Sequence, residues 1–303
     1  MNETERERQQ RAEEELAQKM RMEKPVAVQV RNTLRNMSND LATTYAATGQ
    51  TLDAGQYYDD FVGILRPAYR KAANFFGTQA EKELIRNADD PQHSLLLGAF
   101  ASLALINATT IRQEIEAFEV AKSQDVLAFI NRQVPIRAQE ITNTNQKELE
   151  RSLNGATAEL VAAGAAFGAL EVGRLASRKF RDTSLWRGNT IAATEIQNAA
   201  EGAKQIEATN LQKAIQPVRN QQLGALDTVK EWHTQGDEVV RQAHVQADLQ
   251  RVGFRDAFTV GGEQLRFPGD TSLGATAGNT INCRCSSIQF LDGSLPPNFE
   301  VQS

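Results

Sequence analysis

The strongest constraint on the fold is a helical repeat of apolar residues that recurs through most of the chain. Its clearest instance is a series of side chains spaced three or four residues apart, comprising Val30, Leu34, Met37, Leu41 and Tyr45. Such spacing places the side chains on one face of an amphipathic helix, and that face must be buried against other elements. Residues 25–216 are therefore predicted to form a helical domain.

Turn and capping residues set the expected helix boundaries in the first part of this domain. Gly49 is expected to end the first helix, and Asp53 is placed to cap the next one. Pro67 is expected to bend that second helix. Its buried face would comprise Tyr57, Phe61, Leu65, Tyr69, Ala72 and Phe76.

Later boundaries rest on proline and on small residues. A helix from Ile111 is expected to stop at Pro135, and one long helix is expected over residues 136–180. Within it, Gly164 and Gly168 have the spacing that lets a second helix approach closely. A further helix is predicted to end near Pro217.

Residues 1–24 differ from the rest because they carry alternating charges and almost nothing apolar. Glu7 and Arg11, like Glu15 and Lys19, have the four-residue spacing of helical ion pairs. We expect either a solvated charged helix or a disordered arm, which a partner could order.

Composition narrows the class of protein. With 303 residues, 41% apolar content and 23% charge, the chain is globular, and its net charge of -5 excludes a protein that coats nucleic acid through bulk positive charge. The apolar runs 95–106 and 160–170 are shorter than the roughly 20 residues of a membrane span. Cys283 and Cys285 are too close to bridge without strain, which favours a reducing compartment. The N-terminus has no secretory signal pattern, so synthesis in a cytoplasm is expected.

One segment is locally basic despite the acidic total. Trp186 lies in it, and its cationic side chains are Arg174, Arg178, Lys179, Arg181 and Arg187. Two interpretations stay open: a surface face that balances acidic neighbours, or a site that contacts nucleic-acid phosphates with salt-sensitive affinity.

The sequence pattern changes after Pro217, where residues 217–303 are predicted to form an α+β module. Residues 228–234 alternate as a strand does, and Asp237 is expected to cap a short helix that reaches Gln250. Residues 257–260 and 264–267 flank Gly261-Gly262 and predict a β-hairpin. Residues 281–290, with the Cys-x-Cys motif, are expected to form the last strand. The predicted fold is therefore mainly α, with a small C-terminal α+β module.

The module also holds candidate ligands and nucleophiles. Cys283, Cys285 and His244 could bind zinc, with Asp237 or Asp270 as a fourth ligand. In the alternative, the cysteines only pack in the core and Arg241, Asp237 and Asn282 form a buried polar network. A cysteine nucleophile with His244 as its base is a further hypothesis, but no oxyanion-hole motif accompanies it, so no enzyme is predicted. Glu195 is expected to act in a cap or ion pair.

Three consecutive motifs resemble those of the phage head-morphogenesis, or phage Mu F-like minor head protein, family. The first comprises Trp232, Asp237, Arg241 and His244, the second runs from Phe258 through Val-Gly-Gly-Glu to Phe267-Pro-Gly-Asp270, and the third is Ile281-Asn-Cys-Arg-Cys285. The resemblance covers roughly residues 186–287, and the combination of Pro-Gly-Asp with Asn-Cys-Arg-Cys is its most specific part. Upstream, Ile191-Ala-Ala-Thr-Glu195 is similar to a family element, with Ala193 where the family has arginine.

The resemblance implies a virion component present in few copies, made in the host cytoplasm and held at the portal inside the capsid. Its partners would be the portal protein, the major capsid or scaffolding protein and packaged DNA, and it would act in head assembly, genome packaging or DNA ejection. Trp232, Asp237, Arg241, Asp270 and Asn282 would be structural motif residues. Membrane contact is not expected in the virion. Two other functions stay open, an ejected internal protein that acts at the host membrane and a cysteine-dependent enzyme.

Overall fold

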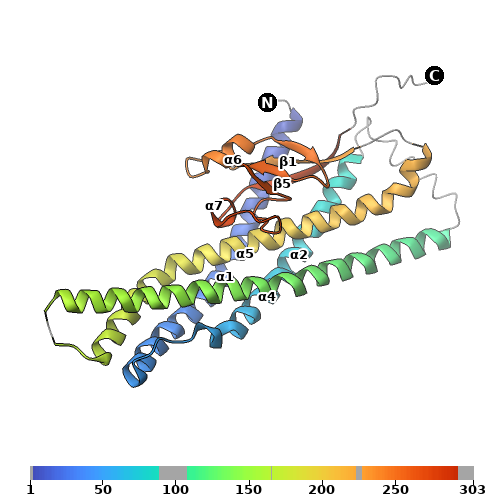
Figure 1. Ribbon diagram of the computed structural model, residues 1–303. Coiled ribbons are helices and arrows are strands. Elements are labelled where there is room, and N and C mark those ends of the chain that lie inside the picture. The colour runs from blue at the N-terminus through green and yellow to red at the C-terminus, as the bar shows by residue number, and fades with distance from the viewer. Residues whose placement is uncertain (1–2, 89–107, 165, 223–226, 293–303) are drawn as a thin grey trace. The chain divides into compact units, whose positions relative to one another are not determined.

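The computed structural model describes residues 3–88, 108–164, 166–222 and 227–292 (Figure 1). Long helices make up most of this part of the chain: α1 (Glu3–Thr48), α2 (Tyr58–Ala88), α4 (Ala108–Ala162) and α5 (Ala169–Gln222), with the 3-10 helix η1 (Ala54–Tyr57) before α2. The prediction of a mainly helical chain with a small C-terminal strand region is confirmed. The apolar run 95–106 lies outside the described residues. None of the helices described has an apolar stretch long enough to cross a membrane.

The C-terminal strands form two small antiparallel sheets. The first has the order β2-β1-β5, with β1 (Asp227–His233) between β2 (Arg251–Gly253) and β5 (Ser286–Asp292). The second is the predicted hairpin of β3 (Phe258–Val260) and β4 (Glu263–Leu265). Gly261 and Gly262 both have positive φ, 58° and 82°, which a two-residue type I′ turn requires. Two short helices, α6 (Gln242–Ala247) and α7 (Ala277–Thr280), complete the module.

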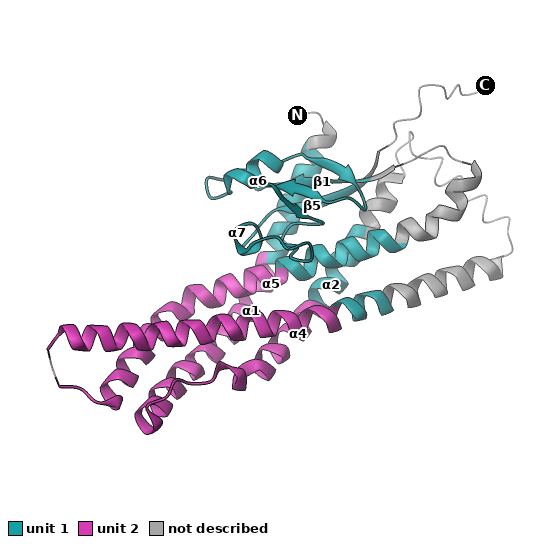
Figure 2. Ribbon diagram, in the orientation of Figure 1, with its two compact units in different colours: residues 1–19, 71–129, 197–303 teal, residues 20–70, 130–196 magenta. Residues whose placement is uncertain are grey.

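The chain divides into two compact units, each assembled from separate segments (Figure 2). Unit 1 comprises residues 1–19, 71–129 and 197–303, and unit 2 comprises residues 20–70 and 130–196. Every long helix contributes one segment to each unit, so α1 and α5 continue through residues 24 and 216, where domain boundaries were expected.

Unit 2 contains the apolar helix faces that the sequence predicts. Val30, Leu34, Met37 and Leu41 are fully buried, and so is the predicted face of α2 within this unit. Gly49 follows the last residue of α1 with φ of 68°, as expected for the residue that ends a helix.

The predicted N-cap of the next element is also confirmed. The Asp53 carboxylate accepts a hydrogen bond of 2.7 Å from the Gly55 backbone N–H. This bond satisfies a backbone N–H group at the start of η1 that has no partner within the helix.

The predicted helix boundaries between residues 111 and 180 are wrong. Pro135 lies inside α4, where burial of Val134 and Ala138 on either side outweighs the cost of about 3 kcal/mol of an interior proline. The helix ends instead at Ala162, and exposed Gly164 follows with φ of 66°. This run of small residues ends a helix because it has almost no apolar side-chain surface to bury.

Close helix packing in unit 2 occurs at two other glycines of α5. A Cβ atom at Gly173 would lie 2.9 Å from the Ala42 carbonyl oxygen, and one at Gly188 would lie 2.4 Å from Cγ of Arg31. Both glycines therefore let α5 approach α1 more closely than alanine would allow.

Glu195 forms a buried ion pair in unit 2, as its position on a predicted helix indicated. Arg137 donates from Nη2 to Glu195 at 2.8 Å and from Nε at 3.0 Å, and the Tyr69 hydroxyl donates at 2.8 Å. Burial and the adjacent carboxylate raise the pKa of Tyr69 well above its ordinary value. The carboxylate is thus satisfied by neighbours on two other helices.

In unit 1, four charged side chains from α1 and α5 form a closed ring, here called the charge quartet (Glu15, Lys19, Glu201 and Lys204). Lys19 lies 2.7 Å from both carboxylates, and Lys204 lies 2.8 Å from Glu15 and 3.2 Å from Glu201. All four side chains are at most 3% exposed. Burial opposes the charge on Glu15, but the attraction of the two lysines prevails and holds its pKa well below the ordinary value.

The quartet corrects the expectation that residues 1–24 form a solvated helix or a disordered arm. The buried positions of α1 continue upstream from Val26 through Met22, Lys19, Glu15, Ala12 and Arg8 at the same three- and four-residue spacing. Charged residues therefore occupy the buried face where the downstream part of α1 has apolar ones. The expected ion pair of Glu15 with Lys19 is confirmed.

Replacing Lys19 with methionine should lower the free energy of unfolding by about 3–5 kcal/mol, because two buried carboxylates would then share one lysine. Denaturant unfolding of the full chain measures this. Lys24→Met is the matched control, since Lys24 is exposed on the same helix and should change stability by at most about 0.5 kcal/mol. Equal effects of the two variants would contradict the role of the quartet.

A second buried carboxylate joins the start of α1 to the sheet. Glu231 of β1 is bonded by Arg8 at 2.9 Å, by His233 at 2.8 Å and by Arg251 at 2.5 Å. Burial acts to raise the pKa of Glu231, but the three partners outweigh it and lower the pKa from 4.5 to about 2. The negative charge of Glu231 therefore stabilises the folded state.

Because the folded pKa of Glu231 is depressed, its contribution should be complete above pH 4.5 and be lost as pH falls toward about 2. The wild type should therefore exceed Glu231→Gln in unfolding free energy at neutral pH, and this difference should shrink as pH falls through that window. Glu238→Gln, at an exposed position, is the control and should follow the wild type. A difference that does not change with pH would refute the assignment.

Candidate metal centre

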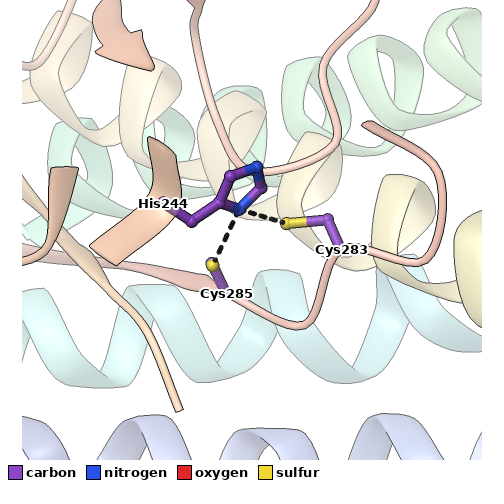
Figure 3. Close-up of side chains that lie close together, drawn as sticks. All are labelled: His244, Cys283 and Cys285. Atoms are coloured by element: carbon purple, nitrogen blue, oxygen red, sulfur yellow. Dashed lines mark hydrogen bonds between the residues drawn. The ribbon is translucent and has the colours of Figure 1, made fainter. Parts of the chain in front are cut away.

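Three side chains with metal-binding atoms converge inside the C-terminal module (Figure 3). The Nδ1 atom of His244 lies 3.3 Å from Sγ of Cys285 and 3.7 Å from Sγ of Cys283. All three ligand atoms lie within 4.8 Å of one another. Each residue is at most 3% exposed, and both cysteines are free thiols. The structure thus brings together the three principal ligands that the sequence indicated.

Local backbone geometry aims these side chains at one point. His244 lies in α6, whereas Cys283 and Cys285 lie in the segment between α7 and β5. Asn282 has φ of 54°, a left-handed conformation that asparagine tolerates better than other non-glycine residues. The Cys-x-Cys motif precedes the last strand, which begins at Ser286, because the turn at Asn282 interrupts the extended chain expected from Ile281.

The cluster lies in the apolar core of the module. Trp232 of β1 packs edge-on against the His244 ring at 5.6 Å between centroids and against Phe258 at 5.3 Å. Both cysteines belong to this core together with Trp232, Ala247, Phe258, Val260 and Leu265. Trp232 therefore forms one wall of the site.

Helix α5 fixes the cysteine segment from the other side. Gln197 donates from Nε2 to the Cys285 carbonyl at 2.7 Å, and Glu201 accepts from the Ser287 N–H at 3.1 Å. Sequence reasoning missed both residues, because polar side chains on a helix are usually exposed. The signal in the sequence was the spacing of Gln197, Glu201 and Gln205, which are four residues apart and so lie on one face of the helix. Gln205 also contacts the module, since it donates to the Phe254 carbonyl at 3.2 Å.

The two thiols differ in acidity within the cluster. The hydrogen bond from Cys285 and the adjacent imidazole lower the pKa of Cys283 well below its ordinary value, even though burial raises it. The contact with Cys283 and burial raise the pKa of Cys285 well above its ordinary value. Cys283 therefore has the lower pKa of the two thiols.

Neither aspartate considered as a fourth ligand belongs to the cluster. Asp237 pairs with Arg284 at 2.8 Å, and it does not cap the predicted helix, since α6 begins later at Gln242. Asp270 accepts from the backbone N–H groups of Arg266 at 2.9 Å and Ser272 at 2.8 Å, so its role is to shape the turn after β4.

Arg241 and the other motif residues also have separate roles. The Arg241 guanidinium donates to the Ile281 carbonyl at 2.6 Å, which joins the start of α6 to the cysteine segment. Arg241, Asn282 and Arg284 line a small hollow that His244 and Cys285 border. The polar network expected from Arg241, Asp237 and Asn282 is not buried, because Asp237 and Asn282 are exposed, and Asp237 pairs with Arg284.

The structure separates the five cations of the expected basic patch. Arg174, Arg178 and Arg181 are exposed on α5, and Lys179 pairs with Glu159 at 2.6 Å. Arg187 is only 6% exposed, lies 3.5 Å from Glu148 and donates to Asn145, so it does not fit a surface that contacts nucleic acid. The exposed patch is therefore limited to the three arginines and the partly exposed Lys179.

The arrangement fits metal binding better than nucleophilic catalysis. The other ring nitrogen of His244, Nε2, has no hydrogen-bond partner among the described residues, so no third group orients the imidazole as a base. Two sulfurs and one nitrogen in a buried site are ligands that zinc prefers.

Comparisons with protein-family models, with curated proteins and with solved structures found no match.

The left-handed turn before the cysteines gives a direct test of the site's framework. Asn282→Gly should retain stability, whereas Asn282→Val should lower the unfolding free energy by about 1–2 kcal/mol, because a β-branched residue disfavours positive φ. Thermal or denaturant unfolding of the three proteins measures this. If the glycine variant loses as much stability as the valine variant, the side chain of Asn282 is responsible and the backbone conformation is not.

Proposed function

We propose that this chain is a minor head protein of a tailed phage, held at the portal inside the capsid, where it acts in head assembly, genome packaging or DNA ejection. The observation that carries the proposal is the combined motif of Trp232, His244, Phe267-Pro-Gly-Asp270 and Asn282-Cys-Arg-Cys285. These residues are similar to the Mu F-like family in type, order and spacing.

The positions of the motif residues support a scaffold role for the module. Trp232, Cys283 and Cys285 are buried in one core, and Asp270 satisfies two backbone N–H groups of a turn. A motif made mostly of such residues specifies how a small module folds and attaches to helix α5. We therefore assign a structural role to the module. Both thiols are at most 3% exposed, which fits this role better than attack on a substrate.

The helical part offers a surface on which a partner can bind. Leu185 and Trp186 are adjacent on α5 in unit 2, and each is 57% exposed. Exposed tryptophan is costly to leave in water and is enriched at the centres of protein interfaces. We therefore assign the contact with the portal protein, or with capsid or scaffolding protein, to this surface of α5.

Mass spectrometry of purified proheads and virions from the phage that encodes the chain tests this proposal. The protein should be present in both particles or in proheads alone, at a few copies per portal, and should co-purify with the portal protein. Absence from both particles would refute the assignment.

A variant makes the same experiment specific to the surface. Trp186→Glu should reduce incorporation into proheads, because the charge would have to be buried in the interface. Val161→Glu is the matched control, since Val161 is 63% exposed in the same unit and should leave incorporation unchanged.

A further inference from the structure

The geometry points to a zinc site at His244, Cys283 and Cys285 that fastens α6 to the segment before β5. This inference does not depend on the phage assignment, because it rests on the positions of three side chains inside unit 1. The site should be tested in the full chain, because Gln197 of helix α5 holds the cysteine segment by a hydrogen bond to the Cys285 carbonyl.

The distances match the edges of a zinc tetrahedron. With Zn–S bonds of about 2.3 Å and a Zn–N bond of about 2.05 Å, tetrahedral angles place nitrogen and sulfur about 3.6 Å apart. The observed separations from His244 Nδ1, 3.3 Å and 3.7 Å, lie on either side of this value. Both nitrogen–sulfur separations therefore suit a tetrahedral ion, and the two sulfurs lie within 4.8 Å of each other.

Both sulfurs converge on one ring nitrogen of His244. A neutral imidazole nitrogen has a single lone pair and can accept a proton from one thiol. The second sulfur faces the same nitrogen without that bond, and its hydrogen-bond partner is the other thiol. A cation at the centre gives all three atoms a common partner.

The protein also positions the ligands before the metal binds. Trp232 fixes the His244 ring by edge-on contact, and Gln197 holds the Cys285 carbonyl at 2.7 Å. A disulfide is not a competing explanation, since cysteines two residues apart would close a strained ring and both are free.

We assign the fourth coordination position to the hollow beside the cluster. Among the residues that the structure describes, the group of candidate ligands contains no fourth histidine, cysteine or carboxylate. The hollow is bordered by His244 and Cys285 and lined by Gln235, Arg241, Asn282 and Arg284. We assign a water molecule to this position, so the ion would have three protein ligands and one water ligand.

Zinc content of the full chain, expressed without a histidine tag in zinc-supplemented medium, tests the site directly. Elemental analysis should give about one zinc per chain, and Cys283→Ser, Cys285→Ser and His244→Gln should each bring it close to zero. His233→Gln is the matched control, because His233 is buried in the same module but bonds Glu231, and it should keep its zinc.

Three measurements on the wild type cover the case in which the variants do not fold. Removal of zinc by a strong chelator should lower the thermal midpoint by several degrees, and added Zn²⁺ should restore it. Zn²⁺ should also slow alkylation of both cysteines at least tenfold, and Co²⁺ should give the thiolate charge-transfer absorption of a tetrahedral site. A chain that is isolated without zinc and whose thermal midpoint and alkylation rate do not respond to added Zn²⁺ would overturn the proposal.

Discussion

One buried carboxylate, Glu201, joins helix α5 to α1 and to strand β5 within unit 1. It pairs with Lys19 of α1 at 2.7 Å and with Lys204 of its own helix, and it accepts two hydrogen bonds from Ser287 of β5. Burial raises the pKa of Glu201, and the two lysines oppose this shift, so loss of either lysine would leave the buried carboxylate with less compensation. The position of the cysteine segment, two residues upstream of Ser287, therefore depends on an electrostatic interaction that begins in α1.

The sequence predicted the elements of the fold where local chemistry decides them. Apolar spacing identified the buried faces of α1 and α2, and the paired glycines identified the β3-β4 hairpin. The predictions failed where tertiary packing prevails over local preference. Pro135 stays inside α4 because the helix on either side of it is buried, and Glu15 and Lys19 are buried because their partners lie on a distant part of the chain.

For the candidate site, the ligand types could be predicted but not the full set of contacts. Cysteine and histidine are rare enough here that their clustering near the C-terminus indicated a site, and the structure places their ligand atoms together. The prediction of an aspartate as the fourth ligand did not hold, because a carboxylate can equally accept hydrogen bonds from backbone N–H groups, as Asp270 does. Gln197 was missed because its partner is a backbone carbonyl, which has no signature in a sequence.

The charge quartet also has a consequence for the order of events during synthesis. Lys19 pairs with a residue 182 positions later, and Arg8 with one 223 positions later, so the start of α1 leaves the ribosome long before its partners exist. An apolar face exposed for that time would be prone to aggregate, whereas a face of lysine, glutamate and arginine remains hydrated. Charged residues at these positions keep the nascent helix hydrated. They can still form specific buried ion pairs once residues 201–231 have been synthesised.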